Sequence, residues 1–256
     1  VLASAALTVC SLLVAGPVLA AETAGWPTYG NDPGGARYSA ASQVTPANVG
    51  QLAIAWEHHS RDLGADFRDR KLAAYEATPV LADGRLYLST PFNRILSIDA
   101  ATGRELWHFD ARPDPSLRYA GVTSRGVALW HDGAAKAGDV CAIRVFAGTI
   151  DGRLLALDAA DGKPCDSFAE HGTLALSNGM RPSGRGQYQV TSPPTIYRDL
   201  VITGSGIGDN RAAALEYGTV RAYDARSGKL AWSFDPLPRG PDTGAANVWA
   251  PISLDP

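Results

Sequence analysis

One stretch of sequence occurs three times in this chain, and it limits the possible folds more than any other feature. Residues 94–109 read RILSIDAATGRELWHF, residues 153–168 read RLLALDAADGKPCDSF, and residues 219–234 read TVRAYDARSGKLAWSF. In each copy an apolar run leads to an Asp, a Gly follows four residues later, and a Phe closes the stretch. The Asp offers a side-chain acceptor to the turn amides, and the Gly can adopt a positive φ. Each copy therefore predicts a β-hairpin.

The spacing of the copies predicts how the hairpins are arranged. Asp99, Asp158 and Asp224 lie 59 and 66 residues apart. Units of strand and turn that recur at a nearly fixed interval are typical of a repeat architecture. Four-stranded units arranged radially form a β-propeller of about 4–8 blades, in which neighbours must stack because no unit buries its faces alone. We expect Trp107 and Trp232, at the same place in the first and third copies, to pack between blades.

The second copy differs from the other two because it reads PCDSF where they carry a Trp. Cys165 lies in that stretch, and Cys141 precedes it by 24 residues. Two cysteines at hairpin ends are plausible disulfide partners in an oxidising compartment, where the crosslink would anchor the blade in place of the Trp. The alternative is a pair of buried thiols. A zinc site is disfavoured, since neither Cys has a Cys or His nearby at ligand spacing.

The start of the chain predicts export. Residues 1–21 carry no charge, and a charged sequence rich in Gly and Pro follows them. This pattern favours a signal peptide cut near Ala20 or Ala21, and a membrane anchor is the alternative because about 20 apolar residues can span a bilayer. We expect residues 22–256 to form part of a propeller domain that continues beyond the C-terminus. The net charge of −3 argues against an electrostatic nucleic-acid interface.

The repeated Asp-x-x-x-Gly-x-x-x-Trp-x-Phe pattern resembles the tryptophan-docking motif of the eight-bladed quinoprotein dehydrogenases. Those enzymes bind pyrroloquinoline quinone (PQQ) and a divalent metal on the propeller axis. From about Trp26 to Pro256, further segments occur in the family's order: GARYSAASQVTPANVGQLAIAW, YEATPVLADGRLYLSTP, VTSRGVALWHD, TSPPTIYRDLVITGSGIGDN and NVWAP. The membrane-associated glucose dehydrogenase branch is the most similar. The resemblance implies an all-β, eight-bladed propeller, of which this chain holds roughly the first three to four blades.

The resemblance also implies a set of cofactor contacts. These are Glu76, Arg125, His131, Thr191, Ser205, Gly206, Asn247 and Trp249. PQQ is a flat, tricarboxylated o-quinone, so its site needs cationic and hydroxyl donors and an aromatic face. The fixed fork of Arg125 suits the quinone oxygens and a carboxylate, Thr191 would donate its hydroxyl to a carboxylate, and Trp249 would form the floor beneath the ring. Each also has a plain structural alternative, such as a solvated Glu, a structural His or a Trp in the blade core.

The loop GSGIGDN carries the metal ligands that the resemblance implies. Its three glycines let the backbone approach a ligand closely. Asp209 offers a carboxylate and Asn210 a carbonyl oxygen, which suit Ca²⁺ or Mg²⁺, although an Asp-Asn turn without metal is the alternative. The metal would act as a Lewis acid. The family's general base, an Asp, would lie beyond Pro256, so we name no catalytic residue and expect this fragment alone to be inactive.

Two departures from the alcohol branch of the family bear on the substrate. That branch has two adjacent cysteines just before the Arg motif, whereas residues 119–125 read YAGVTSR, and it uses Glu where Asp209 stands. Both differences favour a sugar or polyol. We expect a dehydrogenase that oxidises chiefly C1 of an aldose to a lactone and passes electrons to ubiquinone. We expect it in the periplasm, either free or attached to the inner membrane. The alternative is a non-enzymatic scaffold of the outer-membrane barrel-assembly lipoprotein type, against which the ordered site residues argue.

Overall fold

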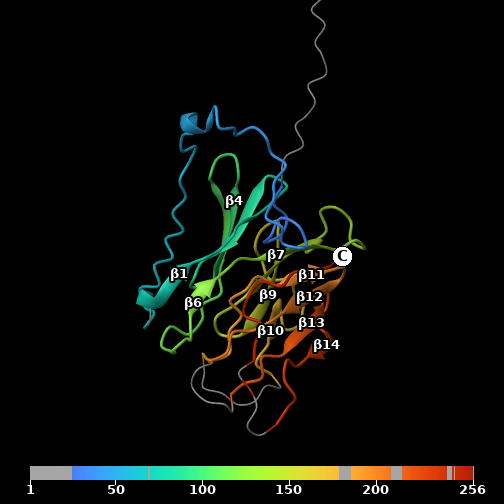
Figure 1. Cartoon of the computed structure of the whole chain (residues 1–256). Helices are drawn as coiled ribbons and strands as arrows, with labels where there is room; N and C mark the ends of the chain where they lie inside the picture. The colour runs from blue at the N-terminus through green and yellow to red at the C-terminus, as the bar shows by residue number, and fades with distance from the viewer. Residues whose placement is uncertain are drawn as a thin grey trace, which may run out of the picture.

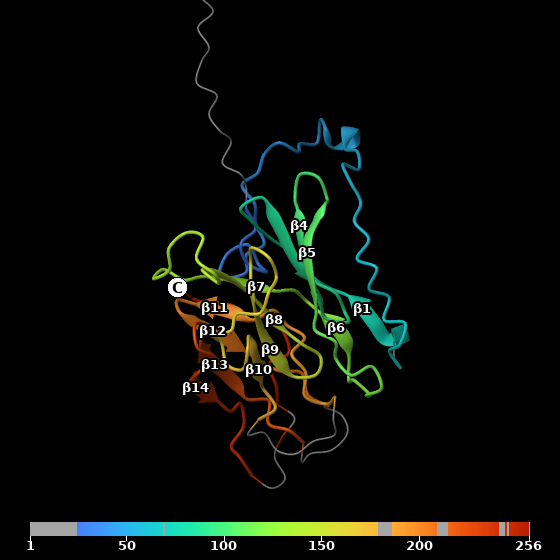
Figure 2. The same ribbon diagram turned by 180° about the vertical axis from the view of Figure 1, so that it is seen from behind.

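Three four-stranded antiparallel sheets stand side by side in the computed structural model of the chain (Figures 1 and 2). The structure describes residues 25–68, 70–178, 186–208, 215–240, 244 and 246–255. The first sheet contains β2 (Val80–Ala82), β3 (Arg85–Ser89), β4 (Arg94–Asp99) and β5 (Glu105–Asp110). The second contains β7 (Ala128–His131), β8 (Ile143–Gly148), β9 (Arg153–Asp158) and β10 (Thr173–Ala175). The third contains β11 (Thr195–Tyr197), β12 (Leu200–Thr203), β13 (Val220–Asp224) and β14 (Leu230–Phe234).

Each sheet is a meander in which strands that follow one another along the chain are paired, as in a propeller blade. Ahead of the first two blades run β1 (Ala73–Tyr75) and β6 (Val122–Ser124), which pair with each other in parallel. Two short 3₁₀ turns, η1 (Val49–Gln51) and η2 (Arg70–Leu72), precede β1. This all-β arrangement of blades confirms the partial propeller that the repeats predict.

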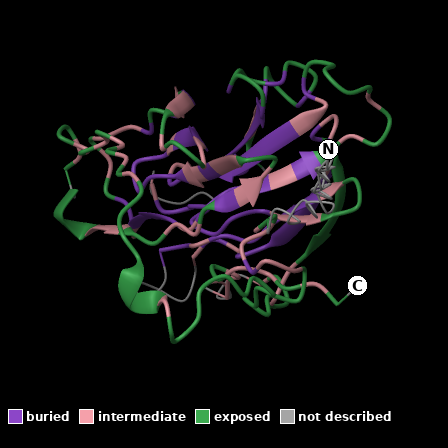
Figure 3. Ribbon diagram, turned by 90° about the horizontal axis from the view of Figure 1, so that it is seen from above, coloured by how far each residue is buried: buried purple, intermediate pink, exposed green. Residues whose placement is uncertain are grey.

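Burial follows the stacking of the blades. The strands of the second blade that carry the repeat core, β8 and β9, are buried along most of their length, whereas every residue of β14 is exposed. Figure 3 shows the same contrast between buried strands and exposed outer segments. One apolar core lies between the first and second blades and another between the second and third. Blade-to-blade contact therefore supplies the cores, as a chain of units that cannot bury their faces alone requires.

The Asp and Gly of the repeat act in the turns as predicted. The Asp99 Oδ1 accepts hydrogen bonds from the amides of Ala101 and Thr102, at 3.1 and 2.8 Å. Gly103 has a φ of 71°, and Gly162 and Gly228 have values of 76° and 73°. Residues with a Cβ rarely adopt this left-handed conformation, so the Gly of each copy is explained by its backbone.

A tryptophan from one unit rests on the glycine turn of the next. The Trp107 indole donates to the Ala159 carbonyl oxygen at 3.1 Å, and a Cβ added to Gly162 would lie 2.5 Å from the indole ring. The predicted packing of Trp107 between blades is therefore confirmed. Trp56, ahead of the first blade, makes the same contact: it donates to the Ala100 carbonyl at 3.1 Å, and its ring lies where a Cβ of Gly103 would stand.

The second copy of the repeat forms only the start of the predicted hairpin: its turn closes and Leu157 bridges Pro164, but no second strand follows within the copy. After β9 the chain turns at residues 166–168, and the outer strand of this blade is β10, which pairs with β9. Cys165 forms a disulfide with Cys141. Phe168 is fully buried and, with Ala169, packs against Gly228 of the third blade. The apolar contact that Trp107 makes one blade earlier is thus made here by Phe168 and Ala169, and this tertiary contact overrides the local strand pattern.

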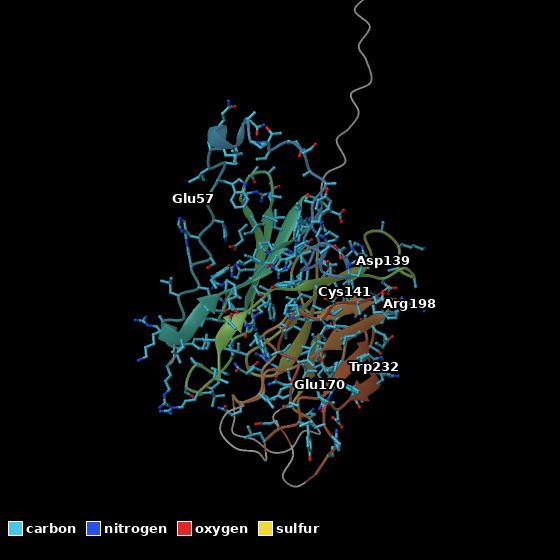
Figure 4. The ribbon with its side chains drawn as sticks, viewed as in Figure 1. Glu57, Asp139, Cys141, Glu170, Arg198 and Trp232 are labelled. Carbon is cyan, nitrogen blue, oxygen red and sulfur yellow. A yellow bond between two sulfur atoms is a disulfide. The ribbon has the colours of Figure 1, made fainter. Side chains whose placement is uncertain are left out.

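Trp232 does not pack between two blades within the described part of the chain. It is 41% exposed on β14, the outer edge strand of the third sheet (Figure 4), because no described segment covers that strand. The predicted signal peptide or anchor at residues 1–21 lies outside the described residues. Among the helices that the structure describes, none is long and apolar enough to cross a bilayer.

Candidate cofactor site

The parallel pair β1 and β6 brings two of the predicted residues together. Tyr75 lies opposite Ser124 in the register, so the next residue of each strand, Glu76 and Arg125, emerges at the same level. The Arg125 guanidinium pairs with the Glu76 carboxylate at 2.8 Å. The backbone also ties the two segments, because the Thr78 amide donates to the Arg125 carbonyl at 3.0 Å. The register of two short strands thus positions this ion pair.

Thr191 joins the pair from the segment ahead of the third blade. The Arg125 amide donates to the Thr191 carbonyl at 2.8 Å, and its guanidinium donates to the Thr191 hydroxyl at 2.9 Å. Sequence reasoning did not single out Gln189, which joins the segment of Thr191 to the segment that leads to Arg125. Its side-chain amide accepts from the Gly121 amide at 3.0 Å and donates to the Gly121 carbonyl at 2.6 Å. No motif marks Gln189 in the sequence, since its role depends on a contact 68 residues away.

Trp249 completes the cluster. The guanidinium carbon of Arg125 lies 5.0 Å from the centre of the Trp249 ring, within the range of a cation–π interaction. The Ser192 hydroxyl donates to the Trp249 carbonyl, which holds this segment beside Thr191. Trp249 is nevertheless 51% exposed, so much of its surface is open to a ligand. Arg125 is the centre of a cluster that draws on four separate segments.

Two more of the predicted contacts lie in the loop between β12 and β13. Gly206 exchanges two backbone hydrogen bonds of 2.8 Å with Gln189, and a Cβ placed on it would lie 3.9 Å from the Thr191 hydroxyl and 4.0 Å from the Trp249 Cβ. Gly206 therefore borders the cluster. Ser205, in contrast, is 1% exposed, and its hydroxyl has no hydrogen-bond partner in the described structure.

Ser205 faces the interior of the blade. It lies near the Tyr188 phenol, whose pKa is raised because that side chain is buried. The neighbouring Ser205 hydroxyl and Arg221 act in the opposite direction on this pKa. The Ser205 side chain is therefore buried beside Tyr188 and is not exposed on the open side of the cluster.

The structure does not bring His131 to the cluster. It is the exposed last residue of β7, six residues beyond Arg125 along an extended chain. The extended strand β7 separates the Cα of His131 from that of Ala128 by about 10 Å, at about 3.3 Å per residue. The strand direction explains the difference, because β7 leads away from the cluster towards the turn before β8.

Of the remaining predicted residues, the structure describes Asn247 but not the two proposed metal ligands. Asn247 is half-buried, and its Cα lies 2.4 Å from where a Cβ on Gly218 would stand, so its backbone packs against the β12–β13 loop. The predicted metal ligands Asp209 and Asn210 lie outside the described residues. Within the described ranges, no group of three His, Cys, Asp or Glu side chains is arranged to hold a metal ion.

A cavity of about 260 Å³ lies further along the same three segments. It is lined by residues 127–129, 193–196 and 251–254 and is closed by the N-terminal loop at residues 27–37. Neither Arg125, Thr191 nor Trp249 lines it. We therefore place the candidate site at the Arg125 cluster, where charge, hydroxyl and aromatic groups meet, and treat the cavity as a separate feature.

These residues fit a flat, anionic ring. Arg125 supplies a cation with several donors, Thr191 a hydroxyl, and Trp249 an open aromatic face, while Gly206 leaves the space of a side chain free beside them. Residues 26–256 match the PQQ family described as "Glucose/ethanol/alcohol dehydrogenase, beta-propeller domain". The chain belongs to this family of PQQ-dependent dehydrogenases.

Relatives agree with this assignment. The chain is 32% identical over 245 residues to the quinoprotein glucose dehydrogenase of Escherichia coli (strain K12), covering 90% of this chain and 30% of that protein. It is 34% identical over 259 residues to the quinate/shikimate dehydrogenase (quinone) of Acinetobacter baylyi, covering 90% and 31%. A crystal structure of the quinohemoprotein alcohol dehydrogenase from Comamonas testosteroni matches with a TM-score of 0.68 and 32% identity, covering 88% of this chain and 29% of that one. The chain thus spans about a third of the length of these PQQ-family relatives.

Proposed function

We propose that the full-length protein is a PQQ- and divalent-metal-dependent dehydrogenase that oxidises a hydroxyl of a sugar or polyol. The observation that carries the proposal is the position of Arg125, which contacts Glu76, Thr191 and Trp249 at once. When bound, PQQ supplies the two-electron oxidant. Ca²⁺ or Mg²⁺ would be held by oxygen ligands, for which Asp209 and Asn210 are the candidates.

The chain's own residues would bind and orient the cofactor. The Arg125 fork suits bidentate contact with carboxylate or quinone oxygens, and its ion pair with Glu76 fixes its direction. Thr191 holds one guanidinium nitrogen and can donate its own hydroxyl proton to a ligand carboxylate. Trp249 offers a planar surface on which a ring can stack at low entropic cost.

The substrate class is proposed from the relatives and from the sequence. Relatives include proteins named as glucose, glycerol and quinate/shikimate dehydrogenases, and others named as alcohol dehydrogenases. The segment of residues 119–125 lacks the adjacent cysteines of the alcohol branch, which supports a sugar or polyol. Oxidation of an aldose at C1 would remove two electrons and two protons and leave a lactone. Ubiquinone, as a two-electron acceptor, would take both up as ubiquinol.

The periplasm is the proposed compartment, and attachment to the inner membrane stays a prediction. Support comes from the uncharged residues 1–21 and from the disulfide between Cys141 and Cys165, since such bonds persist in oxidising compartments. The scaffold alternative loses support, because a family of dehydrogenase propellers matches the chain from residue 26 to residue 256.

The test is reconstitution of the full-length open reading frame, purified without cofactor. PQQ with Ca²⁺ or Mg²⁺ is added, and dye reduction is followed with glucose, other aldoses, polyols, quinate and ethanol. Turnover that needs both PQQ and metal and is fastest with an aldose or polyol is the expected result. Turnover confined to ethanol would refute the substrate class, and absence of PQQ binding would refute the dehydrogenase.

A further inference from the structure

The N-terminal loop at residues 26–37 connects the first blade to the segment that follows the third. It begins on the first blade, where the Trp26 and Leu81 backbones exchange two hydrogen bonds of 2.9 and 2.8 Å. Further along, the Leu254 amide donates to the Pro33 carbonyl at 2.8 Å. Two segments that are far apart in the sequence are therefore held by one short loop.

The contact at Leu254 lies close to the cofactor cluster along the chain. Arg125, Thr191 and Trp249 each come two residues before a segment that lines the cavity of about 260 Å³, and Leu254 lines the same cavity. Residues 27–37 close this cavity. Figures 1 and 2 show the loop, in blue, beside β7 and the C-terminal end of the chain. The loop thus contacts the segment of Trp249 five residues beyond that tryptophan.

The segment of Trp249 depends on other parts of the chain for its position. None of the described residues 246–255 belongs to a strand. On one side the segment is held by the third blade, because the Thr195 hydroxyl donates to the Ile252 carbonyl at 3.2 Å, and Ile252 and Leu254 pack against the apolar core of that blade. The N-terminal loop holds it on the other side. The backbone that carries Trp249 therefore has two supports.

The loop crosses itself where it meets this segment. The Arg37 amide donates to the Gly30 carbonyl at 2.8 Å, and a Cβ on Gly30 would lie 2.4 Å from the Gly35 Cα. Gly35 in turn faces the segment of Trp249, since a Cβ on Gly35 would lie 3.3 Å from the Ser253 hydroxyl oxygen. A shift of Gly35 away from Gly30 would therefore change the contact with Ser253.

We propose that residues 26–37 position Trp249 for the cofactor, an inference that rests on the proposed function. Trp249 is the aromatic face on which the ring of PQQ would stack, and it is 51% exposed, so the orientation of its indole depends on the backbone that carries it. Stacked rings are sensitive to distance and tilt. The loop residues act through residues 249–254 and are positioning residues, not cofactor contacts.

The first test is PQQ binding to the full-length protein in the presence of Ca²⁺, followed by absorbance. The variant is Gly30→Ala, whose methyl group must push Gly35 aside, and the control is Gly50→Ala, where a Cβ meets nothing within 4 Å. Neither glycine has a positive φ, so neither alanine strains the backbone conformation. We expect Gly30→Ala to weaken PQQ binding about twofold to tenfold, the range that stacking on an aromatic ring contributes. Gly50→Ala should bind PQQ as the wild type does.

The second test follows Trp249 itself without cofactor. Fluorotryptophan is incorporated into the full-length protein, and the Trp249 resonance is identified in the fluorine NMR spectrum by its loss in Trp249→Phe. Gly30→Ala should shift this resonance, whereas Gly50→Ala should leave it in place. Pro33→Gly is the milder variant if Gly30→Ala does not fold, because Pro33 is exposed and glycine keeps the carbonyl acceptor while it frees φ. It should act in the same direction with a smaller effect.

The outcomes separate the inference from the proposed function. An unchanged Trp249 resonance, or an unchanged PQQ affinity, in variants whose thermal midpoint shows that they are folded would overturn the inference, while PQQ binding by the wild type leaves the proposed function standing. Absence of PQQ binding in the wild type would refute the proposed function. The fluorine resonance alone would then decide whether the loop positions Trp249.

Discussion

The guanidinium carbon of Arg125 lies 5.0 Å from the centre of the Trp249 ring, although 124 residues separate the two in sequence. The same guanidinium pairs with Glu76 and with the Thr191 hydroxyl. Glu76 lies ahead of the first blade, Thr191 lies ahead of the third and Trp249 follows the third, so the cluster exists only when the blades are stacked. Arg125 is therefore the residue whose replacement should reveal most about the site.

Replacement of Arg125 by Lys should weaken PQQ binding about tenfold to hundredfold. Lysine keeps the charge but lacks the planar fork, so it cannot contact several partners in fixed directions. A hydrogen bond to a charged group contributes about 1.5–3 kcal/mol, and each 1.4 kcal/mol corresponds to about tenfold in affinity. The control is Arg198→Lys, since Arg198 lies over the Tyr197 ring at 5.1 Å, away from the cluster. Equal PQQ affinity in the two variants, measured by titration, would argue against a cofactor role for Arg125.

Replacement of Gly162 by Ala should destabilise the protein more than the same change at Gly84. Both have positive φ, 76° and 72°, so both variants bear the cost of a left-handed alanine, about 1–2 kcal/mol. A Cβ at Gly162 would also meet the Trp107 ring at 2.5 Å, whereas one at Gly84 meets nothing within 4 Å. Overpacking adds about 1–3 kcal/mol. The thermal midpoints of the two variants are compared. Equal midpoints would show that the Trp107 ring can move aside for the added methyl group without a loss of stability.

Removal of the disulfide should lower stability by about 3–4 kcal/mol, because the bond closes a loop between residues 24 apart in sequence. The change is Cys141→Ala with Cys165→Ala. Both side chains are buried, and alanine avoids placing unsatisfied polar groups there. Urea unfolding of the variant is compared with that of the wild type in the presence and absence of reductant. If reductant leaves the wild-type midpoint unchanged while the thiols become reactive, the bond contributes little.

The ion pair between Asp132 and Arg226 should make stability fall at acid pH. The Arg226 side chain, at 2.7 Å, and the Ala134 amide hold the pKa of Asp132 below its ordinary value of 3.8. Because the folded pKa is the lower one, the stabilisation is present above the unfolded pKa and is lost as the pH falls through the folded value. Both side chains are partly exposed, so we expect no more than about 1 kcal/mol. The thermal midpoint of Asp132→Asn should lie below that of the wild type at pH 7 and converge with it below pH of about 3.

Asp224→Asn serves as the comparison for that titration. Its carboxylate accepts from the Ser227 amide and hydroxyl at 2.8 and 2.6 Å within one turn and does not join two blades. If Asp132→Asn follows the wild-type curve at every pH, the contact between the second and third blades does not depend on this charge pair.

The sequence predicted the parts of the fold that repeat and missed those that depend on a partner far along the chain. The apolar run ahead of each turn Asp located β4 and β13, and the Asp and Gly of each turn behave as expected. The prediction of a second strand in the second copy was wrong. Phe168 has a strand position by pattern, but it packs in the core beside Phe146, with ring centres 5.3 Å apart. A single repeat cannot show which neighbour its side chains will meet.

The candidate site was predicted through resemblance to a family, with unequal results. Glu76, Arg125, Thr191 and Trp249 lie together in the structure, whereas His131 is carried away by the direction of β7. Gln189 escaped notice because its side chain bonds to Gly121, a contact across 68 residues that no motif marks in the sequence.

The tryptophan that sits on a glycine turn also fixes the angle between neighbouring blades. The Trp56 ring lies 2.5 Å from the Cβ position of Gly103, and the Trp107 ring lies the same distance from that of Gly162. The Trp107 contact joins the first blade to the second and so limits their relative rotation, and a ring of blades closes only if such rotations add up to a full turn. An error of a few degrees at one joint would be multiplied around the circle. Between the second and third blades Phe168 and Ala169 pack against Gly228 in place of a tryptophan, so different side chains can set the angle that closure of a ring requires.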